Sequence, residues 1–241
     1  MFYFKLILVT LWALISSSLW FIRALFSWRD PRLFSPSVNF LSWGGLKILG
    51  YKTSLKGKEY LHTLPAVLVV NHQSALDTLL LGSIWPPKVV PIGRKEIANV
   101  PIIGWWFVAC GATLINRSSP EEARRTLDKQ IALLKNGFAI GMTPEGTRNK
   151  LGKGLLPFKK GAFHLAIQAQ VPIVPIVIAP LGEIANWKNK TLKKALIPIE
   201  TLEPIPTVGL TEKDVDSLIE KVHSLMAKKL QELEGKIISE K

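Results

Sequence analysis

The sequence has a single cysteine, Cys110, in 241 residues. One cysteine excludes a network of disulfides within the chain, and it excludes a zinc site built from several cysteines. No segment recurs at a fixed period, which excludes solenoids and propellers. The sequence also lacks a G-x-S-x-G motif, so it does not carry the nucleophile elbow of the α/β-hydrolases.

Acidic residues are scarce. Asp and Glu number 18 against 31 Lys and Arg, which gives a formal net charge of +13. This surplus predicts an anionic partner, which can be nucleic acid, a membrane surface or a phosphorylated substrate. Hydrophobic residues make up 48% of the chain and supply a sizeable core, so disorder does not describe the whole chain.

The N-terminal part contains two long stretches without charge, at 6–22 and 33–46. A membrane span needs about 20 apolar residues, so neither stretch is a comfortable span. Aromatic residues near both stretches suit a membrane interface. We therefore expect residues 1–50 to form a two-helix membrane hairpin, with helices near 5–27 and 36–50, sunk into one leaflet. A cleaved signal peptide and a transmembrane anchor are the alternatives.

From residue 51 to 241, short apolar runs alternate with longer polar–apolar segments, as in α/β folds. We predict an α/β domain with a mixed, mostly parallel sheet flanked by helices. Strands are expected at 52–56, 66–70, 88–92, 112–115, 138–142, 173–178 and 195–201. Helices are expected at 75–83, 100–109, 120–136, 160–169 and 211–233.

A histidine and an aspartate follow the apolar run at 66–70. His72 stands at the end of this strand, and Asp77 enters the next expected helix. Ligands of open α/β sheets bind at such strand ends. A carboxylate on one ring nitrogen fixes the tautomer of a histidine and stabilises its imidazolium, so the pair suits general-base catalysis. The alternative is structural, with His72 capping the turn and Asp77 capping the helix.

Basic residues follow other expected strands. Arg148 lies beyond a Pro-Glu-Gly-Thr turn, and its planar guanidinium suits phosphate oxygens. Glu145 in this turn can accept hydrogen bonds from a polyol or brace the turn. Arg94, Lys95 and Arg117 follow two further strands. Together these cations would form a phosphate site, whereas each alone can be ordinary surface charge.

Four blocks occur in a fixed order: HQSALD as H-x4-D, KEIANVPIIGWW with INR, PEGTR, and VPIVPIVI. H-x4-D alone is a weak signal, but the four blocks together resemble the glycerolipid acyltransferase family over about residues 51–203. The resemblance implies a membrane-bound enzyme that transfers an acyl chain from an acyl thioester to 1-acyl-glycerol-3-phosphate, giving phosphatidic acid.

The resemblance also implies residue roles. His72 matches the catalytic base of the family and Asp77 its partner. The phosphate- and glycerol-binding blocks match Lys95, Arg117, Glu145, Gly146 and Arg148. The wall of the acyl site matches Pro172 and Pro175. Arg94 is adjacent to Lys95 in the sequence, so it stays open which of the two contacts the phosphate.

The implied reaction needs no metal and no cofactor, and acyl-CoA or acyl carrier protein supplies the acyl chain as co-substrate. Cys110 lies among apolar residues that raise the pKa of a thiol, which favours direct transfer over an acyl-enzyme. Expected partners are a membrane lipid substrate and an anionic lipid surface, with no nucleic acid. The expected location is the cytoplasmic face of the cell membrane, where acyl thioesters are made.

Three alternatives stay open. An acyltransferase acting on another lysophospholipid or on glycerol-3-phosphate would share the four blocks. A hydrolase would use the same base to activate water. A non-enzymatic basic module for membrane surfaces or nucleic acid explains the charge but not the motifs, and no RNA-binding or recognition-helix pattern is present.

Overall fold

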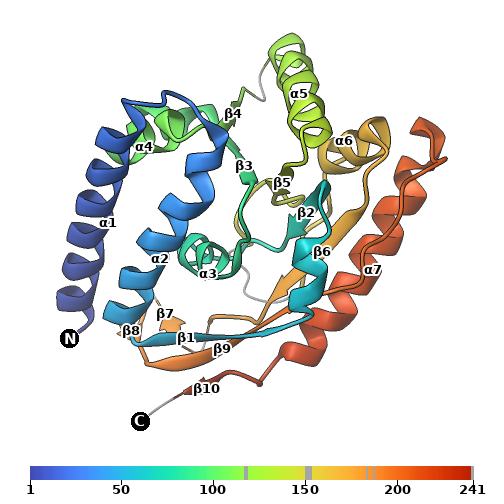
Figure 1. The fold of residues 1–241 in the computed structure, drawn as a ribbon. Coiled ribbons are helices and arrows are strands. Elements are labelled where there is room, and N and C mark those ends of the chain that lie inside the picture. The colour runs from blue at the N-terminus through green and yellow to red at the C-terminus, as the bar shows by residue number, and fades with distance from the viewer. Residues whose placement is uncertain (117–118, 150–153, 183, 187, 240–241) are drawn as a thin grey trace.

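The computed structural model describes residues 1–116, 119–149, 154–182, 184–186 and 188–239. A large central sheet separates two groups of helices (Figure 1). Its strands are β1 (Tyr51–Lys56), β2 (Ala66–Val70), β3 (Val89–Arg94), β4 (Thr113–Ile115), β5 (Ala139–Met142), β6 (Ile173–Ile178), β9 (Ala195–Thr201) and β10 (Ile238–Ser239). A separate small sheet pairs β7 (Ala185–Asn186) with β8 (Thr191–Leu192).

The strand order is β1-β9-β6-β2-β5-β3-β4, with β10 beside β9. Neighbouring strands are parallel except for the pairs of β9 with β6 and with β10. The predicted mixed, mostly parallel sheet is thus confirmed, and β2, β6 and β9 have the predicted bounds. The strands β7, β8 and β10 were not predicted, because two residues are too few to show an apolar period.

The helices are α1 (Phe2–Ala24), α2 (Phe34–Leu49), α3 (Asp77–Ile84), α4 (Ile103–Ala109), α5 (Pro120–Lys135), α6 (Gly161–Ala169) and α7 (Val215–Leu233). Side chains of β2 alternate between the two faces of the sheet. Leu68 and Val70 belong to a core shared with α2, α3 and α4, whereas Val67 and Val69 belong to a core shared with α5, α6 and α7. This two-sided burial explains the uninterrupted apolar sequence of β2.

The two N-terminal helices have different surroundings. α1 exposes a stripe of large apolar side chains, and it is the one helix within the described ranges that is long and apolar enough to cross a membrane. α2 is largely buried, and its Phe34, Val38 and Leu49 belong to the core that it shares with α3, α4 and one face of the sheet. The expected second membrane helix is therefore mainly a core helix, because an uncharged stretch suits lipid and protein interior equally well.

Candidate active site

A cleft of about 510 Å³ opens at the carboxyl ends of β2, β3 and β5. Parallel strands place these ends at one edge of the sheet, which is where ligands bind in such folds. Its apolar lining includes Phe34, Val38, Leu81, Trp85, Phe107 and Met142. Its polar lining includes His72, Asp77, Arg94, Thr147 and Arg148. One cleft therefore offers a histidine, two guanidinium groups and an apolar surface.

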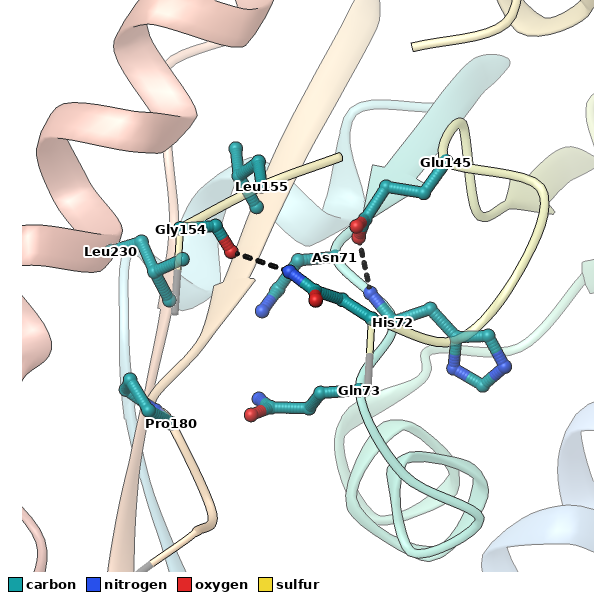
Figure 2. A pocket seen from close by; sticks show the side chains of 9 residues that line it. Asn71, His72, Gln73, Glu145, Gly154, Leu155, Pro180 and Leu230 are labelled. Carbon is teal, nitrogen blue, oxygen red and sulfur yellow. Dashed lines mark hydrogen bonds between the residues drawn. The ribbon is translucent and has the colours of Figure 1, made fainter. Parts of the chain in front are cut away.

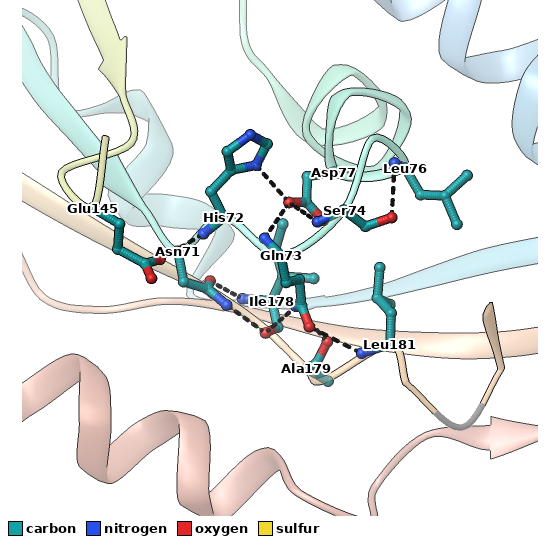
Figure 3. A network of polar contacts seen from close by, with 10 residues as sticks. All are labelled: Asn71, His72, Gln73, Ser74, Leu76, Asp77, Glu145, Ile178, Ala179 and Leu181. Carbon is teal, nitrogen blue, oxygen red and sulfur yellow. Dashed lines mark hydrogen bonds and ion pairs between the residues drawn. The ribbon is translucent and has the colours of Figure 1, made fainter. Parts of the chain in front are cut away.

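His72 and Asp77 form the predicted pair. His72 Nδ1 donates a hydrogen bond of 2.7 Å to Asp77 Oδ2 (Figure 3). The same oxygen accepts from the backbone N–H groups of Gln73 at 2.7 Å and Ser74 at 2.9 Å. Asp77 is only 1% exposed. Since an ionised carboxylate only accepts hydrogen bonds, Nδ1 carries the proton and Nε2 of the neutral ring is free to accept one.

Two amide side chains on either side of His72 tie this turn to the end of β6. Asn71 Nδ2 donates to Ile178 O at 3.0 Å, and Ile178 N donates to Asn71 Oδ1 at 2.8 Å. Gln73 Nε2 donates to Ala179 O at 3.0 Å (Figure 3). Neither amide was predicted from the sequence. The only signal available was a pair of polar residues flanking the histidine.

Glu145 is 2% exposed and lies on the backbone side of His72, with the imidazole pointing away from it (Figure 2). Its Oε1 accepts from His72 N at 2.8 Å, and its Oε2 accepts from Leu156 N at 2.9 Å. Burial raises the pKa of Glu145, and these two N–H donors oppose that shift. Both oxygens are engaged by the backbone, so the geometry fits the bracing alternative.

Of the two arginines that line the cleft, Arg94 bonds to the turn that contains Glu145, and Arg148 follows that turn in the chain. Gly146 N donates to Thr143 O at 3.0 Å, and the φ of Gly146 is 71°, a conformation that favours glycine. Arg94 Nη2 donates to Gly146 O at 2.8 Å. Arg94 and Arg148 are exposed side chains that line the cleft. They are therefore available to an anionic group in the cleft.

Of the other expected residues that the structure describes, Lys95, Pro172 and Pro175 do not line the cleft. Lys95 Nζ lies 3.7 Å from Glu122 of α5, and the Lys95 side chain is 61% exposed. Pro172 precedes the first residue of β6, at the edge of the sheet opposite the cleft, and Pro175 lies buried in the middle of that strand. Arg117 lies outside the described residues.

The remaining reactive side chain is Cys110. It is buried, and this burial raises the pKa of its thiol to about 11, as its apolar sequence context indicates. A thiol of this kind is a poor nucleophile at neutral pH. Over the described ranges, His, Cys, Asp and Glu side chains form no group of three or more that could hold a metal ion.

Comparison with known proteins gives consistent matches. The family model described as "Acyltransferase" matches residues 52–179. The chain is 36% identical over 188 residues to a 1-acyl-sn-glycerol-3-phosphate acyltransferase of Saccharomyces cerevisiae, covering 77% of this chain and 62% of that protein. It is 39% identical over 163 residues to the human beta form, covering 67% of this chain and 58% of that protein. The chain thus spans about three-fifths of the length of these relatives.

A solved structure shows the same fold. The crystal structure of a 1-acyl-sn-glycerophosphate acyltransferase from Thermotoga maritima aligns with a TM-score of 0.72. The alignment covers 95% of each chain at 21% sequence identity. At this identity the likeness concerns the fold.

Proposed function

This chain belongs to the acyltransferase family, and we propose that it converts 1-acyl-glycerol-3-phosphate to phosphatidic acid, with an acyl thioester as donor. The observation that carries the proposal is the 2.7 Å contact between His72 and Asp77 in a cleft that also holds two arginines. The curated relatives named above supply the substrate class. This reaction is a step of phospholipid biosynthesis.

His72 acts as the general base. Its Nε2 takes the proton from the free hydroxyl while the hydroxyl oxygen attacks the thioester carbonyl carbon. The tetrahedral intermediate collapses, the carbon–sulfur bond breaks, and the imidazolium returns the proton to the sulfur. Asp77 holds the ring and stabilises its positive charge through the Nδ1 hydrogen bond. General-base catalysis of this kind contributes on the order of 10²–10⁴ in rate.

Arg148 and Arg94 bind the phosphate of the acceptor. Both side chains line the cleft, and a guanidinium group can donate two parallel hydrogen bonds to two oxygens of one phosphate. Arg94 lines the cleft and Lys95 does not, so we assign the phosphate role to Arg94 of that pair. The apolar part of the cleft receives an acyl chain. Acyl-CoA or acyl carrier protein is the co-substrate, and the scheme uses no further cofactor.

Glu145 has a positioning role in this scheme. Its carboxylate accepts from the backbone N–H of His72, which fixes where the catalytic turn lies relative to the loop that carries Arg148. The second bond, from Leu156 N, holds the carboxylate itself in place. Glu145 thus acts through His72 and makes no contact with the substrate.

Helix α1 holds the protein on one face of the membrane. Near its first turn, Lys5 Nζ donates to Leu49 O at 2.7 Å, and just past its last turn Arg29 N donates to Ala109 O at 2.8 Å. Both ends of the helix are therefore attached to the body of the protein, and these attachments support an arrangement with both ends on the same side of the bilayer. The exposed apolar stripe of α1 enters one leaflet, as interfacial helices do. The face is cytoplasmic, where acyl thioesters are made.

The experiment supplies the full chain in vesicles with lysophosphatidate and an acyl thioester, and it quantifies lipid product and free thiol. The proposal predicts phosphatidic acid and thiol in equal amounts. Equal thiol release with and without lysophosphatidate would instead identify a hydrolase. A panel with glycerol-3-phosphate and other lysophospholipids identifies the preferred acceptor, and a clear preference for one of these would contradict the proposed substrate.

A further inference from the structure

Exposed lysines gather beside the N-terminal end of α1. They come from the end of α2 and from the hairpin of β7 and β8, whose strands lie next to these helices in Figure 1. We call them the hairpin lysine cluster, which consists of Lys47, Lys188, Lys190, Lys193 and Lys194. None of them lines the catalytic cleft. The cleft chemistry therefore does not account for this concentration of charge.

The cluster adjoins exposed aromatic side chains of both α1 and α2. Lys190 Nζ lies 5.3 Å from the centre of the Tyr3 ring, and Lys47 Nζ lies 5.4 Å from the centre of the Trp43 ring. Tyr3 is 57% exposed and Trp43 is 61% exposed. Aromatic rings with ammonium groups at the edge of an apolar surface are typical of the headgroup level of a membrane.

A buried lysine fixes the hairpin to both helices. Lys5 is 7% exposed, and its Nζ donates to Leu49 O of α2 at 2.7 Å and to Leu192 O of β8 at 3.5 Å. Burial lowers the pKa of Lys5, and the positive charge of Lys194 lowers it further. The positive charge of Lys194 is thus close enough to act on Lys5, the residue that attaches α1 to α2 and β8. The cluster consequently keeps a fixed position relative to the apolar stripe.

We propose that the hairpin lysine cluster binds the headgroups of anionic phospholipids and sets the orientation of the protein on the membrane. This inference rests on the proposed function, in which α1 enters one leaflet. With the stripe in the acyl region, the cluster lies at the level of the lipid phosphates, where lysines attract anionic lipid. In that function the acceptor and the product are themselves anionic lipids, so the surface would also concentrate the substrate.

An acidic carrier protein is the competing occupant. The membrane is favoured because two of the lysines sit on aromatic rings that belong to the exposed apolar surface of α1 and α2. A carrier protein that covered these rings would compete with the bilayer for the same side chains. The cluster therefore fits a lipid surface that meets the stripe and the lysines together.

The test compares two variants of the full chain with equal loss of charge. The hairpin variant combines Lys188→Gln, Lys190→Gln, Lys193→Gln and Lys194→Gln. The control variant combines Lys135→Gln, Lys213→Gln, Lys221→Gln and Lys228→Gln, which are exposed positions on α5, on α7 or just before α7. Vesicle flotation measures the fraction bound to phosphatidylcholine alone and to phosphatidylcholine mixed with phosphatidylglycerol.

We expect the hairpin variant to lose at least about tenfold in partitioning to the anionic vesicles and to behave like wild type on neutral ones. The control should match wild type on both, and added salt should remove the difference between the variants. Equal losses for both variants would show that only total charge matters and would overturn the proposal. So would unchanged flotation of the hairpin variant with a raised KM for an acyl carrier protein donor, which would assign the cluster to the carrier. Flotation needs no turnover, so its outcome is independent of the acyl-transfer assay.

Discussion

Arg148 and Glu145 stand three residues apart, yet their environments are opposite. Arg148 is exposed and lines the cleft, whereas Glu145 is buried with both carboxylate oxygens bonded to backbone N–H groups. These environments suit the roles proposed above, in which Arg148 binds the phosphate of the substrate and Glu145 positions His72. The two roles predict different kinetic effects.

Replacing Arg148 with alanine should raise the KM for lysophosphatidate far more than the KM for the acyl thioester. Loss of a charge-assisted hydrogen bond costs about 1.5–3 kcal/mol, or roughly 10- to 150-fold in binding. Steady-state kinetics with each substrate varied in turn measures both constants. Equal increases in the two KM values would argue against a phosphate contact.

The variant Glu145→Gln should lower kcat by about ten- to a hundredfold and leave the KM for lysophosphatidate nearly unchanged. The glutamine retains one acceptor oxygen, so one of the N–H groups of His72 and Leu156 loses its partner, and the catalytic turn shifts. Arg148→Ala is the matched comparison, with the reverse pattern. If Glu145→Gln instead raised that KM at constant kcat, Glu145 would be a glycerol ligand.

The sequence predicted His72 and Asp77 because both lie in one short turn, where spacing along the chain determines the contact. It left the role of Glu145 open, because its partners are backbone atoms that only the folded chain brings together. The choice between Arg94 and Lys95 depends on which of the two side chains the folded chain turns toward the cleft, and of the two it is Arg94 that lines it.

The same distinction, between what local sequence determines and what only tertiary contacts determine, holds for the secondary-structure elements. The strands β2, β6 and β9 were predictable because apolar runs with clear ends carry their own signal. The expected placement of helix α2 in the membrane is not confirmed, because most of its side chains pack on α3 and the sheet, which the sequence of α2 alone does not reveal. Local sequence therefore determined where elements form, and tertiary packing determined which of them face water or lipid.

The short 3-10 helix Glu212–Asp214, which leads directly into α7, offers a test of local capping. Asp214 Oδ2 accepts from both Thr211 N and Thr211 Oγ1 at 2.8 Å, and these bonds, the backbone one first, lower the pKa of Asp214. A lowered pKa in the folded state means that the carboxylate stabilises the fold above its unfolded pKa of about 3.8. Asp214→Ala should therefore lower the melting temperature by a few degrees at neutral pH.

The difference in melting temperature between wild type and Asp214→Ala should shrink as the pH falls through the folded pKa of Asp214. Protonation then removes the charge from the carboxylate that accepts these hydrogen bonds in the wild type. Thermal unfolding followed at several pH values measures it. Glu220→Ala, an exposed acid on α7, is the control for charge alone. A melting difference that stayed constant from neutral to acidic pH would exclude an ionised cap.

At the scale of the whole molecule, the attachment of both ends of α1 to the body predicts a protein on one membrane face. Single cysteines at Phe2→Cys and Arg32→Cys, in a Cys110→Ala background, report each end of the helix. A membrane-impermeant thiol reagent applied to right-side-out vesicles should label neither site, and lysed vesicles should allow both to react. Labelling of one site alone from outside would establish a true span.

The most direct test of the account is the rate of phosphatidic acid formation by His72→Ala relative to wild type. Both proteins would be compared at equal vesicle binding and with matching melting temperatures. With His72 as the base, we expect a loss of at least about a hundredfold, within the range of general-base catalysis. Asp77→Asn should lose nearly as much, because the ring then adopts the wrong tautomer. A His72→Ala protein that kept more than about a tenth of wild-type turnover would contradict the assignment of His72 as the base.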